Sequence, residues 1–210
     1  MVQKVVVATH NAGKLTEIAR IIGETVEGSQ FEFVTSGQLD LPDPVEDGTT
    51  FEANALIKAR DAASRTGLPA LADDSGLIVD VMGMAPGILS ARWSGRHGDD
   101  AANNALLLAQ LSDIPDEERT ARFRCAAALV IPAQVSTDGQ AHEYVQVCDM
   151  EGVLLREERG DNGFGYDPLF VPRNQEGSLT SAEMTAQEKN AISHRGKALR
   201  AIAQYFHDLV

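Results

Sequence analysis

Positive charge is scarce in this sequence. Its 210 residues include 18 lysines and arginines against 31 aspartates and glutamates, so the formal net charge is −13. Proteins that bind DNA or RNA without regard to sequence take most of their affinity from cations that contact phosphates. We therefore expect no nucleic acid polymer as a partner. A small anionic ligand is compatible with this charge, because one site can gather a few local cations and a metal ion.

Cysteine and long apolar runs are also scarce. The two cysteines, Cys125 and Cys148, lie in apolar strand-like stretches, so we expect buried thiols and neither a disulfide nor a metal site. No apolar run approaches the length that spans a membrane, and residues 1–4 lead directly into a strand pattern, so we expect no secretion leader. We expect a cytoplasmic protein without a membrane partner, folded as a single domain over residues 1–210.

The spacing of apolar residues predicts a mixed α/β fold. Strands are expected at 4–9, 31–35, 121–132, 143–149 and 152–157, the last three as an antiparallel set, and a short strand at the end of the loop 160–172. Loops are expected at 41–48 and 84–100. A first helix is expected from about Lys14, and a second from a capping box of Thr49 and Glu52 to Gly67. A third is expected after Asp99 or Asp100, with Ala105, Leu108 and Leu111 buried. Two helices end the chain: one starts at a capping box of Thr180 and Glu183, and the other runs from Ser193 to Leu209 with Leu199, Ile202 and Phe206 buried.

Two adjacent acids, Asp73 and Asp74, interrupt the apolar stretch 68–80. We expect two strands here, joined by a turn over 73–76. Neighbouring carboxylates repel each other, and burying one is costly unless a cation or hydrogen-bond donors compensate. One of them could form an Asx turn with backbone amides. A metal ion beside Asp74 would relieve the repulsion and leave a carboxylate that can orient or deprotonate water.

The loop "THNAGK", residues 9–14, joins a strand to a helix. Backbone N–H groups at a helix start attract phosphate, and Lys14 would add a mobile positive charge. The spacing is not that of a Walker A loop, and an ordinary turn with a solvated lysine is the alternative.

Further acids precede the helix that follows this region, at Glu46 and Asp47. Mg²⁺ takes one or two protein carboxylates together with water and substrate phosphates, so Glu46 and Asp74 are candidates. The alternatives are solvation of a loop and, for Asp47, capping of the next helix. Ser75 and Gly76 suit the close approach of a phosphate.

The loop "GDNGFGYDP" places an aromatic pair among glycines. Phe164 could stack on a flat ring, and Tyr166 or Asp167 could form a hydrogen bond to a base or sugar; a turn with a core aromatic is the alternative.

The segment "EKNAISHRGKAL" gathers Lys189, His194, Arg195 and Lys197. Cations at a helix start are unfavourably placed, so we expect an anionic partner here rather than a solvated basic face. Together these features indicate a nucleotide polyphosphate with Mg²⁺.

Five blocks of the sequence carry a resemblance to one known family. They are "VVVATHNAGKLTEI", "FEANALIKAR", "LADDSGLIVD" with "APGILSARWSG", "NGFGYDPLF" and "EKNAISHRGKAL". In this order they closely resemble the HAM1-like pyrophosphatases of noncanonical purine nucleoside triphosphates, also called dITP/XTP or inosine triphosphate pyrophosphatases. The resemblance implies an elongated mixed β-sheet flanked by helices, two lobes with a central substrate cleft, dependence on Mg²⁺ and a homodimer.

The same resemblance implies roles for individual residues. The triphosphate would be held by Thr9, His10, Asn11, Ala12, Gly13 and Lys14; the metal by Glu46 and Asp74, with Asp74 also the proton acceptor; and the rest of the substrate by Ser75, Phe164, Gly165, Tyr166, Asp167, Lys189, His194 and Arg195. His10 departs from the small residue that many relatives carry at this position.

The implied reaction is hydrolysis of a nucleoside triphosphate to the monophosphate and pyrophosphate, which would cleanse the nucleotide pool of ITP, dITP and XTP. A Maf-like nucleotide pyrophosphatase with a different base preference is one alternative. A nucleotide-binding module without turnover is the other, although extra acids would weaken the binding of an anion unless a metal is present.

Overall fold

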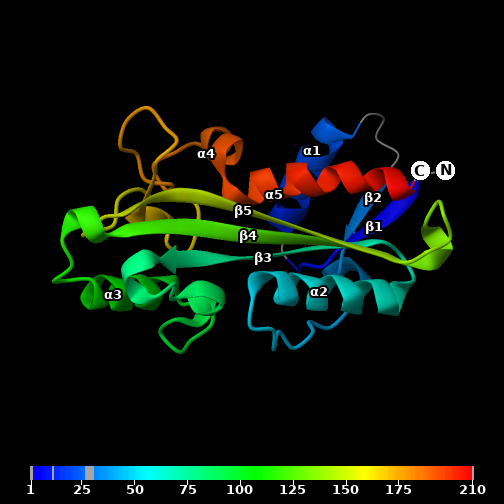
Figure 1. The fold of residues 1–210 in the computed structure, drawn as a ribbon, viewed down its shortest axis with the longest axis horizontal. Coiled ribbons are helices and arrows are strands. Elements are labelled where there is room, and N and C mark those ends of the chain that lie inside the picture. The colour runs from blue at the N-terminus through cyan, green and yellow to red at the C-terminus, as the bar shows by residue number, and fades with distance from the viewer. Residues whose placement is uncertain (1, 11, 27–30, 210) are drawn as a thin grey trace. The chain divides into compact units, whose positions relative to one another are not determined.

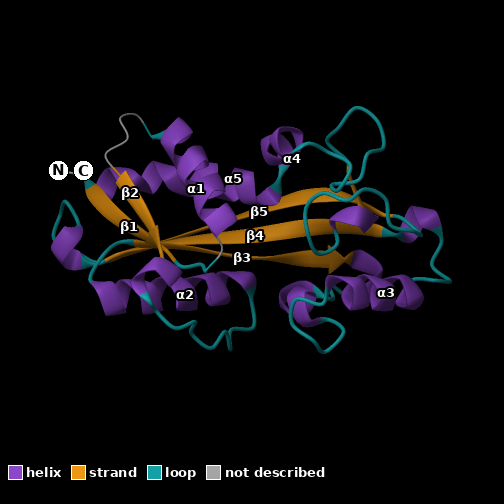
Figure 2. Cartoon of the chain, turned by 180° about the vertical axis from the view of Figure 1, so that it is seen from behind, coloured by secondary structure: helices purple, strands orange, loops and turns teal. Residues whose placement is uncertain are grey.

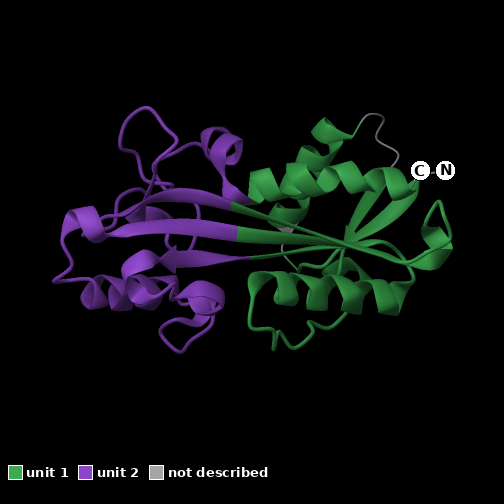
Figure 3. Ribbon diagram, in the orientation of Figure 1, with its two compact units in different colours: residues 1–74, 125–148, 195–210 green, residues 75–124, 149–194 purple. Residues whose placement is uncertain are grey.

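The structure, a computed structural model, describes residues 2–10, 12–26 and 31–209. Six strands form one mixed sheet in the order β2-β1-β3-β4-β5-β6, with helices beside it (Figures 1 and 2). The predicted α/β class is therefore confirmed. The chain divides into two compact units, residues 1–74, 125–148 and 195–210 (unit 1) and residues 75–124 and 149–194 (unit 2) (Figure 3). The single domain and the substrate cleft remain predictions.

Unit 1 holds the parallel part of the sheet. Strand β1 (Gln3–Val7) pairs in parallel with β2 (Phe31–Thr35) and with the start of β3 (Ala70–Val79). Helices α1 (Ala12–Thr25) and α5 (His194–Ala203) pack their apolar side chains on one face of these strands. Helix α2 (Phe51–Thr66) lies on the other face (Figures 1 and 2). As predicted, Leu199, Ile202 and Phe206 are buried.

The core of unit 2 contains the end of β3 and parts of two long strands, β4 and β5. Helix α3 (Asp100–Gln110) and the strands β4 (Thr120–Ile131), β5 (His142–Leu154) and β6 (Phe170–Pro172) enclose an apolar core, and α4 (Ala186–Ile192) follows later in the chain. Strand β5 covers the strand predicted at 143–149 and continues without a break to Leu154, so the separate strand predicted at 152–157 does not form. Gly152 lets β6 approach, because a Cβ there would collide with the carbonyl of Val171.

The continuity of β3 is a second correction. The turn predicted over 73–76 does not form, since β3 is a strand from Ala70 to Val79. Buried apolar residues flank the two acids on both sides, and each carboxylate has a cationic partner described below. These partners offset the free-energy cost of burying the two carboxylates in a strand, so no solvent-exposed turn is required.

Two helix starts differ from prediction. The N-cap of α2 is Thr50, whose Oγ1 accepts the N–H of Ala53 at 3.1 Å, and not Thr49. Thr180 and Glu183 do form reciprocal hydrogen bonds, but they close a turn. Helix α4 begins after a second capping box, made by Thr185 and Glu188. Gly67 ends α2 in a left-handed conformation, as predicted.

Helix α3 begins after Asp99 and Leu111 is buried, as predicted, but the rest of its buried face is different. Ala105 is exposed and Leu108 is half-buried, whereas Asn103, Asn104 and Leu107 are buried. The two asparagines form hydrogen bonds to neighbouring loops, so a polar stretch of the helix is buried where apolar spacing alone predicted alanine.

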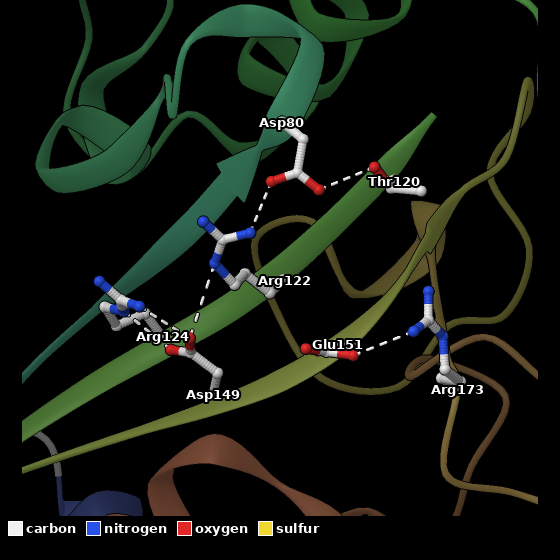
Figure 4. A network of polar contacts seen from close by, with 7 residues as sticks. All are labelled: Asp80, Thr120, Arg122, Arg124, Asp149, Glu151 and Arg173. Carbon is white, nitrogen blue, oxygen red and sulfur yellow. Dashed lines mark hydrogen bonds and ion pairs between the residues drawn. The ribbon is translucent and has the colours of Figure 1, made fainter. Parts of the chain in front are cut away.

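Along the part of β4 in unit 2, apolar side chains in the core alternate with charged side chains that form ion pairs. Figure 4 shows Arg124 paired with Asp149 through two contacts of 2.8 Å, and Arg122 between Asp80 at 2.5 Å and Asp149 at 3.6 Å. The intervening Phe123 points into the core. This period of two is what a strand with one packed face requires. Among the described residues, no helix is both long and apolar enough to cross a membrane.

A buried arginine holds the end of α3. Arg119 is 1% exposed, and its guanidinium donates to the carbonyl oxygens of Leu111 at 2.6 Å, Leu154 at 3.0 Å and Leu155 at 2.6 Å. Burial lowers the pKa of this guanidinium from its usual value. The cation also lies at the carbonyl end of the helix dipole, which favours it.

We expect Arg119→Met to lower the free energy of unfolding by about 3 kcal/mol, because buried carbonyl oxygens lose their donor. Arg173→Met is the matched control, since the ion pair of Arg173 with Glu151 is well exposed (Figure 4), and a change within about 0.5 kcal/mol is expected. Urea denaturation measures both. Equal losses in the two variants would contradict this assignment.

Candidate functional site

The alternation of β3 sends Asp73 and Asp74 to opposite faces of the strand. Asp73 faces the side of α1 and α5, because its partners are Lys14 and Arg195. Asp74 faces the side of α2, because its partners are Asn54 and Lys58. The two acids thus belong to different environments.

Asp73 forms a buried ion-pair cluster. The Nε of Arg195 donates to its Oδ2 at 3.1 Å, and the Nζ of Lys14 lies 3.4 Å from its Oδ1. Arg195 also pairs with Glu17 at 3.6 Å. Burial opposes the ionisation of Asp73, but Lys14 and Arg195 hold the pKa of its carboxyl well below the usual range. These contacts describe a structural ion pair.

At the start of α5, Arg195 has anionic partners within the chain. Arg195 is 8% exposed, and its guanidinium is held by Asp73 and Glu17. His194 is buried and stacks on Phe123, with ring centroids 5.1 Å apart. Both were predicted to bind substrate directly, a role that remains a prediction.

Asp74 belongs to a convergent acidic pair. The Nζ of Lys58 lies 3.4 Å from Asp74 Oδ1 and 3.4 Å from Glu46 Oε1. Burial raises the pKa of Asp74 above its usual value, Lys58 opposes that rise, and the charge of Glu46 adds to it. Burial likewise works against the charge of Lys58, but Asp74, Asp73 and Glu46 outweigh it and raise the pKa of the ammonium.

The residues around Asp74 fit a hard cation. The carboxylates of Glu46 and Asp74 lie on either side of one cation, the ammonium of Lys58. Asn54, whose Nδ2 donates to Asp74, has a buried Oδ1 with no hydrogen-bond partner among the described residues. Carboxylate and amide oxygens are the ligands that Mg²⁺ takes. Within the described ranges, no cluster of three or more His, Cys, Asp or Glu side chains could hold a metal. Two carboxylates suffice when water and substrate phosphate supply the rest.

The loop predicted to bind phosphate, residues 9–14, includes Asn11, which lies outside the described residues. Lys14 is half-buried, in the first turn of α1. The ring of His10 contacts Asp43 at 2.8 Å and the carbonyl of Leu41 at 3.0 Å. His10 thereby links residues 9–14 to the loop 41–48, which carries Glu46. Binding of phosphate by this loop remains a prediction.

The glycine-aromatic loop of unit 2 is built around Asp167. Its Oδ2 accepts the N–H of Phe164 at 3.0 Å and the ammonium of Lys189 at 2.5 Å. A Cβ at Gly163 would collide with the same oxygen, so this position requires glycine. Lys189 Nζ lies 5.6 Å from the ring centroid of Phe164, and that ring is 60% exposed. An exposed ring beside a cation suits a planar, electron-rich ligand.

Tyr166 is placed differently from its predicted role. It is 3% exposed, and its hydroxyl donates to the carbonyl of Ser90 at 2.9 Å. Burial, with the nearby charge of Asp100, raises the pKa of its phenol. In the described structure its side chain anchors the loop in the core, and Gly165 and Ser75 are half-buried.

Two residues of the acidic site were not predicted, Asn54 and Lys58. They lie four apart on α2, so both project from the same face of the helix towards Asp74. The block "FEANALIKAR" contains them, and helical spacing of two polar residues within an otherwise apolar face was the available signal.

The fold and these groups define a class: an α/β protein with a half-buried acidic pair suited to a divalent cation, a lysine at a helix start and an exposed ring flanked by a cation. The sequence profile of the Ham1 family matches residues 5–205. This chain belongs to the Ham1 family.

Individual relatives agree in sequence and fold. A dITP/XTP pyrophosphatase of Bifidobacterium longum subsp. infantis is 57% identical, over 95% of this chain and 96% of the relative. The crystal structure of a nucleoside-triphosphatase, also named dITP/XTP pyrophosphatase, from Mycobacterium abscessus is 51% identical, covers 95% of this chain and 97% of its own, and has a TM-score of 0.75. A HAM1 protein from Coxiella burnetii, 39% identical over 98% of both chains, has a TM-score of 0.84.

Proposed function

We propose that this protein hydrolyses noncanonical purine nucleoside triphosphates, ITP, dITP and XTP, to the monophosphate and pyrophosphate. The observation that carries the proposal is that the carboxylates of Glu46 and Asp74 flank one cation, the ammonium of Lys58, each at 3.4 Å. The names of the relatives, dITP/XTP pyrophosphatases, support the substrate class.

The chemistry follows from the groups of unit 1. Asp74, whose pKa is raised by burial, accepts the proton of the water that attacks the α-phosphorus. Glu46 and Asp74 would hold Mg²⁺, which would supply positive charge to the phosphate oxygens. Lys14 and Lys58 contribute positive charge against the negative charge that grows on the leaving pyrophosphate.

Base selectivity is assigned to the loop around Asp167. The ammonium of Lys189 can only donate hydrogen bonds, and one of its protons already goes to Asp167. A donor favours the 6-oxo group of hypoxanthine or xanthine over the 6-amino group of adenine, and an unmatched buried donor costs about 1–3 kcal/mol. Phe164 would stack on the base.

A substrate panel tests the proposal. The purified protein is incubated with Mg²⁺ and ITP, dITP, XTP, ATP, GTP or dTTP, and the release of pyrophosphate and orthophosphate is measured separately. Pyrophosphate from the first three alone is expected. Preference for another base would favour a Maf-like activity, binding without product would favour a nucleotide-binding module, and orthophosphate would exclude cleavage between the α- and β-phosphates.

Lys14→Ala is expected to raise the KM for ITP by about tenfold or more, because a charge-assisted hydrogen bond to phosphate is lost. The kcat should change less. Lys4→Ala is the matched control, since Lys4 pairs with Glu32 on an exposed part of unit 1. Steady-state kinetics of both variants decide the point, and an unchanged KM in Lys14→Ala would remove this lysine from the phosphate site.

A cytoplasmic homodimer is proposed from the resemblance alone. The chain mass is 22.5 kDa, so light scattering after size-exclusion chromatography should return twice that value. A mass equal to one chain, at the concentrations used for the activity assay, would contradict the dimer.

A further inference from the structure

Two side chains of helix α3 form hydrogen bonds to the backbone of Gly165, in the glycine-aromatic loop (residues 160–168). Asp100 Oδ2 accepts the N–H of Gly165 at 2.6 Å, and Asn104 Nδ2 donates to the carbonyl oxygen of Gly165 at 3.1 Å. Asp100 and Asn104 lie four apart on α3 and so share one face of the helix. Both polar groups of Gly165 are therefore fixed by a single rigid element.

The grip is made from buried polar groups at an energetic cost. Asn104 is 3% exposed, and its Nδ2 also donates to Glu158 Oε1 at 2.6 Å. Its Oδ1 is buried without a hydrogen-bond partner among the described residues. The opposite amide orientation would set oxygen against the oxygens of Glu158 and Gly165, so the orientation is determined. A buried oxygen without a hydrogen-bond partner is destabilising, so the presence of Asn104 at this position indicates a role other than stabilising the fold.

The helix itself does not need these two side chains. Asp99 already caps α3, through its Oδ1 and the N–H of Ala102, and Leu107 anchors the helix in the core of unit 2. The carboxylate of Asp100 is directed at the loop instead. Next to the gripped peptide, Phe164 presents its exposed ring and Asp167 receives Lys189.

We infer that Asp100 and Asn104 are positioning residues for base recognition: by holding the Gly165 peptide they set the directions of Phe164 and Asp167. This inference rests on the proposed function, in which those side chains contact the purine. Displacement of a recognition group by about 1 Å is enough to weaken a site strongly. Neither positioning residue touches the substrate, and both act through Gly165.

Two substitutions at Asp100 separate this role from helix stabilisation. Asp100→Ala removes the acceptor for Gly165, whereas Asp100→Asn keeps an acceptor oxygen and removes the same charge from the helix start. We expect Asp100→Ala to raise the KM for ITP about tenfold with kcat within about twofold of the wild type, and Asp100→Asn to restore a KM near the wild-type value. Both variants should melt at similar temperatures.

Asn104→Leu gives an independent readout. It removes the donor to the Gly165 carbonyl, so we expect the KM for ITP to rise with kcat within about twofold of the wild type. In Asp100→Ala, the amide proton resonance of Gly165 should shift upfield in NMR spectra and recover in Asp100→Asn, with no substrate present.

The outcomes are distinguishable from failure of the proposed function. If the wild-type protein releases pyrophosphate but Asp100→Ala keeps its KM, or if Asp100→Asn is as impaired as Asp100→Ala, the positioning role is wrong. An unmoved Gly165 amide resonance in Asp100→Ala would also overturn it. If the wild-type protein hydrolyses no nucleotide while the amide resonance moves as expected, the grip on the loop stands and its link to base recognition fails.

Discussion

Asp74→Asn is expected to lower the kcat for ITP by at least about a hundredfold, the usual contribution of a positioned general base. The amide keeps the shape of the side chain but cannot accept the proton of the attacking water, and it is a weaker ligand for Mg²⁺. Pyrophosphate release at saturating ITP and Mg²⁺ measures the loss. Asp113→Asn, at an exposed position of unit 2, is the matched control and should retain the wild-type rate.

The same substitution should not destabilise the fold. Burial raises the pKa of Asp74 in the folded protein, so its ionised form at neutral pH works against folding and a neutral amide removes that cost. The melting temperature is expected to be unchanged or higher. A variant that keeps most of the wild-type rate would remove Asp74 from the reaction.

Asp73→Asn, unlike Asp74→Asn, should destabilise the fold. We expect it to lower the free energy of unfolding by about 3–5 kcal/mol, because it leaves the buried Arg195 without its main partner. Asp74→Asn serves as the control for stability, since it changes the adjacent residue in the same way. Adding Arg195→Met to Asp73→Asn should recover part of the loss, because a neutral pair has no unpaired buried charge.

The stability difference between the wild type and Asp73→Asn depends on pH with a defined sign. Lys14 and Arg195 hold the pKa of Asp73 below its unfolded value, so this carboxylate contributes its full stability above the unfolded pKa and loses it as pH falls. The difference should be constant above about pH 5 and shrink below about pH 4. Urea denaturation at a series of pH values measures it, and a difference that grows on acidification would contradict the ion pair.

The elements that local sequence determines were predicted well. Strand β2 falls on the predicted residues 31–35, and Gly67 ends α2 as its position indicated. Helix starts were predicted less accurately, because the same capping pattern occurs twice before α4. Thr180 and Glu183 make the expected hydrogen bonds, yet α4 begins after the second pair, Thr185 and Glu188. A capping box marks a turn, and only the residues after it decide whether a helix continues.

The turn predicted at β3 does not form because of a contact that is distant in sequence. Arg195 pairs with Asp73 across 122 positions of sequence, and no local pattern reveals such a partner. Two adjacent acids therefore indicated a turn, whereas in the fold each has its own cation: Asp73 pairs with Arg195, and Asp74 pairs with Lys58, which also pairs with Glu46. Binding of substrate by His194 and Arg195 remains a prediction.

Glu46 and Asp74 are proposed to hold a divalent ion against the substrate triphosphate. Crystals of the wild-type protein soaked with Mn²⁺ and a non-hydrolysable analogue of ITP would locate this ion through the anomalous signal of the metal. We expect a peak bound by both carboxylates and by the triphosphate, with the ammonium of Lys58 displaced from its position between Glu46 and Asp74. A triphosphate whose metal lies away from Glu46 and Asp74 would contradict it.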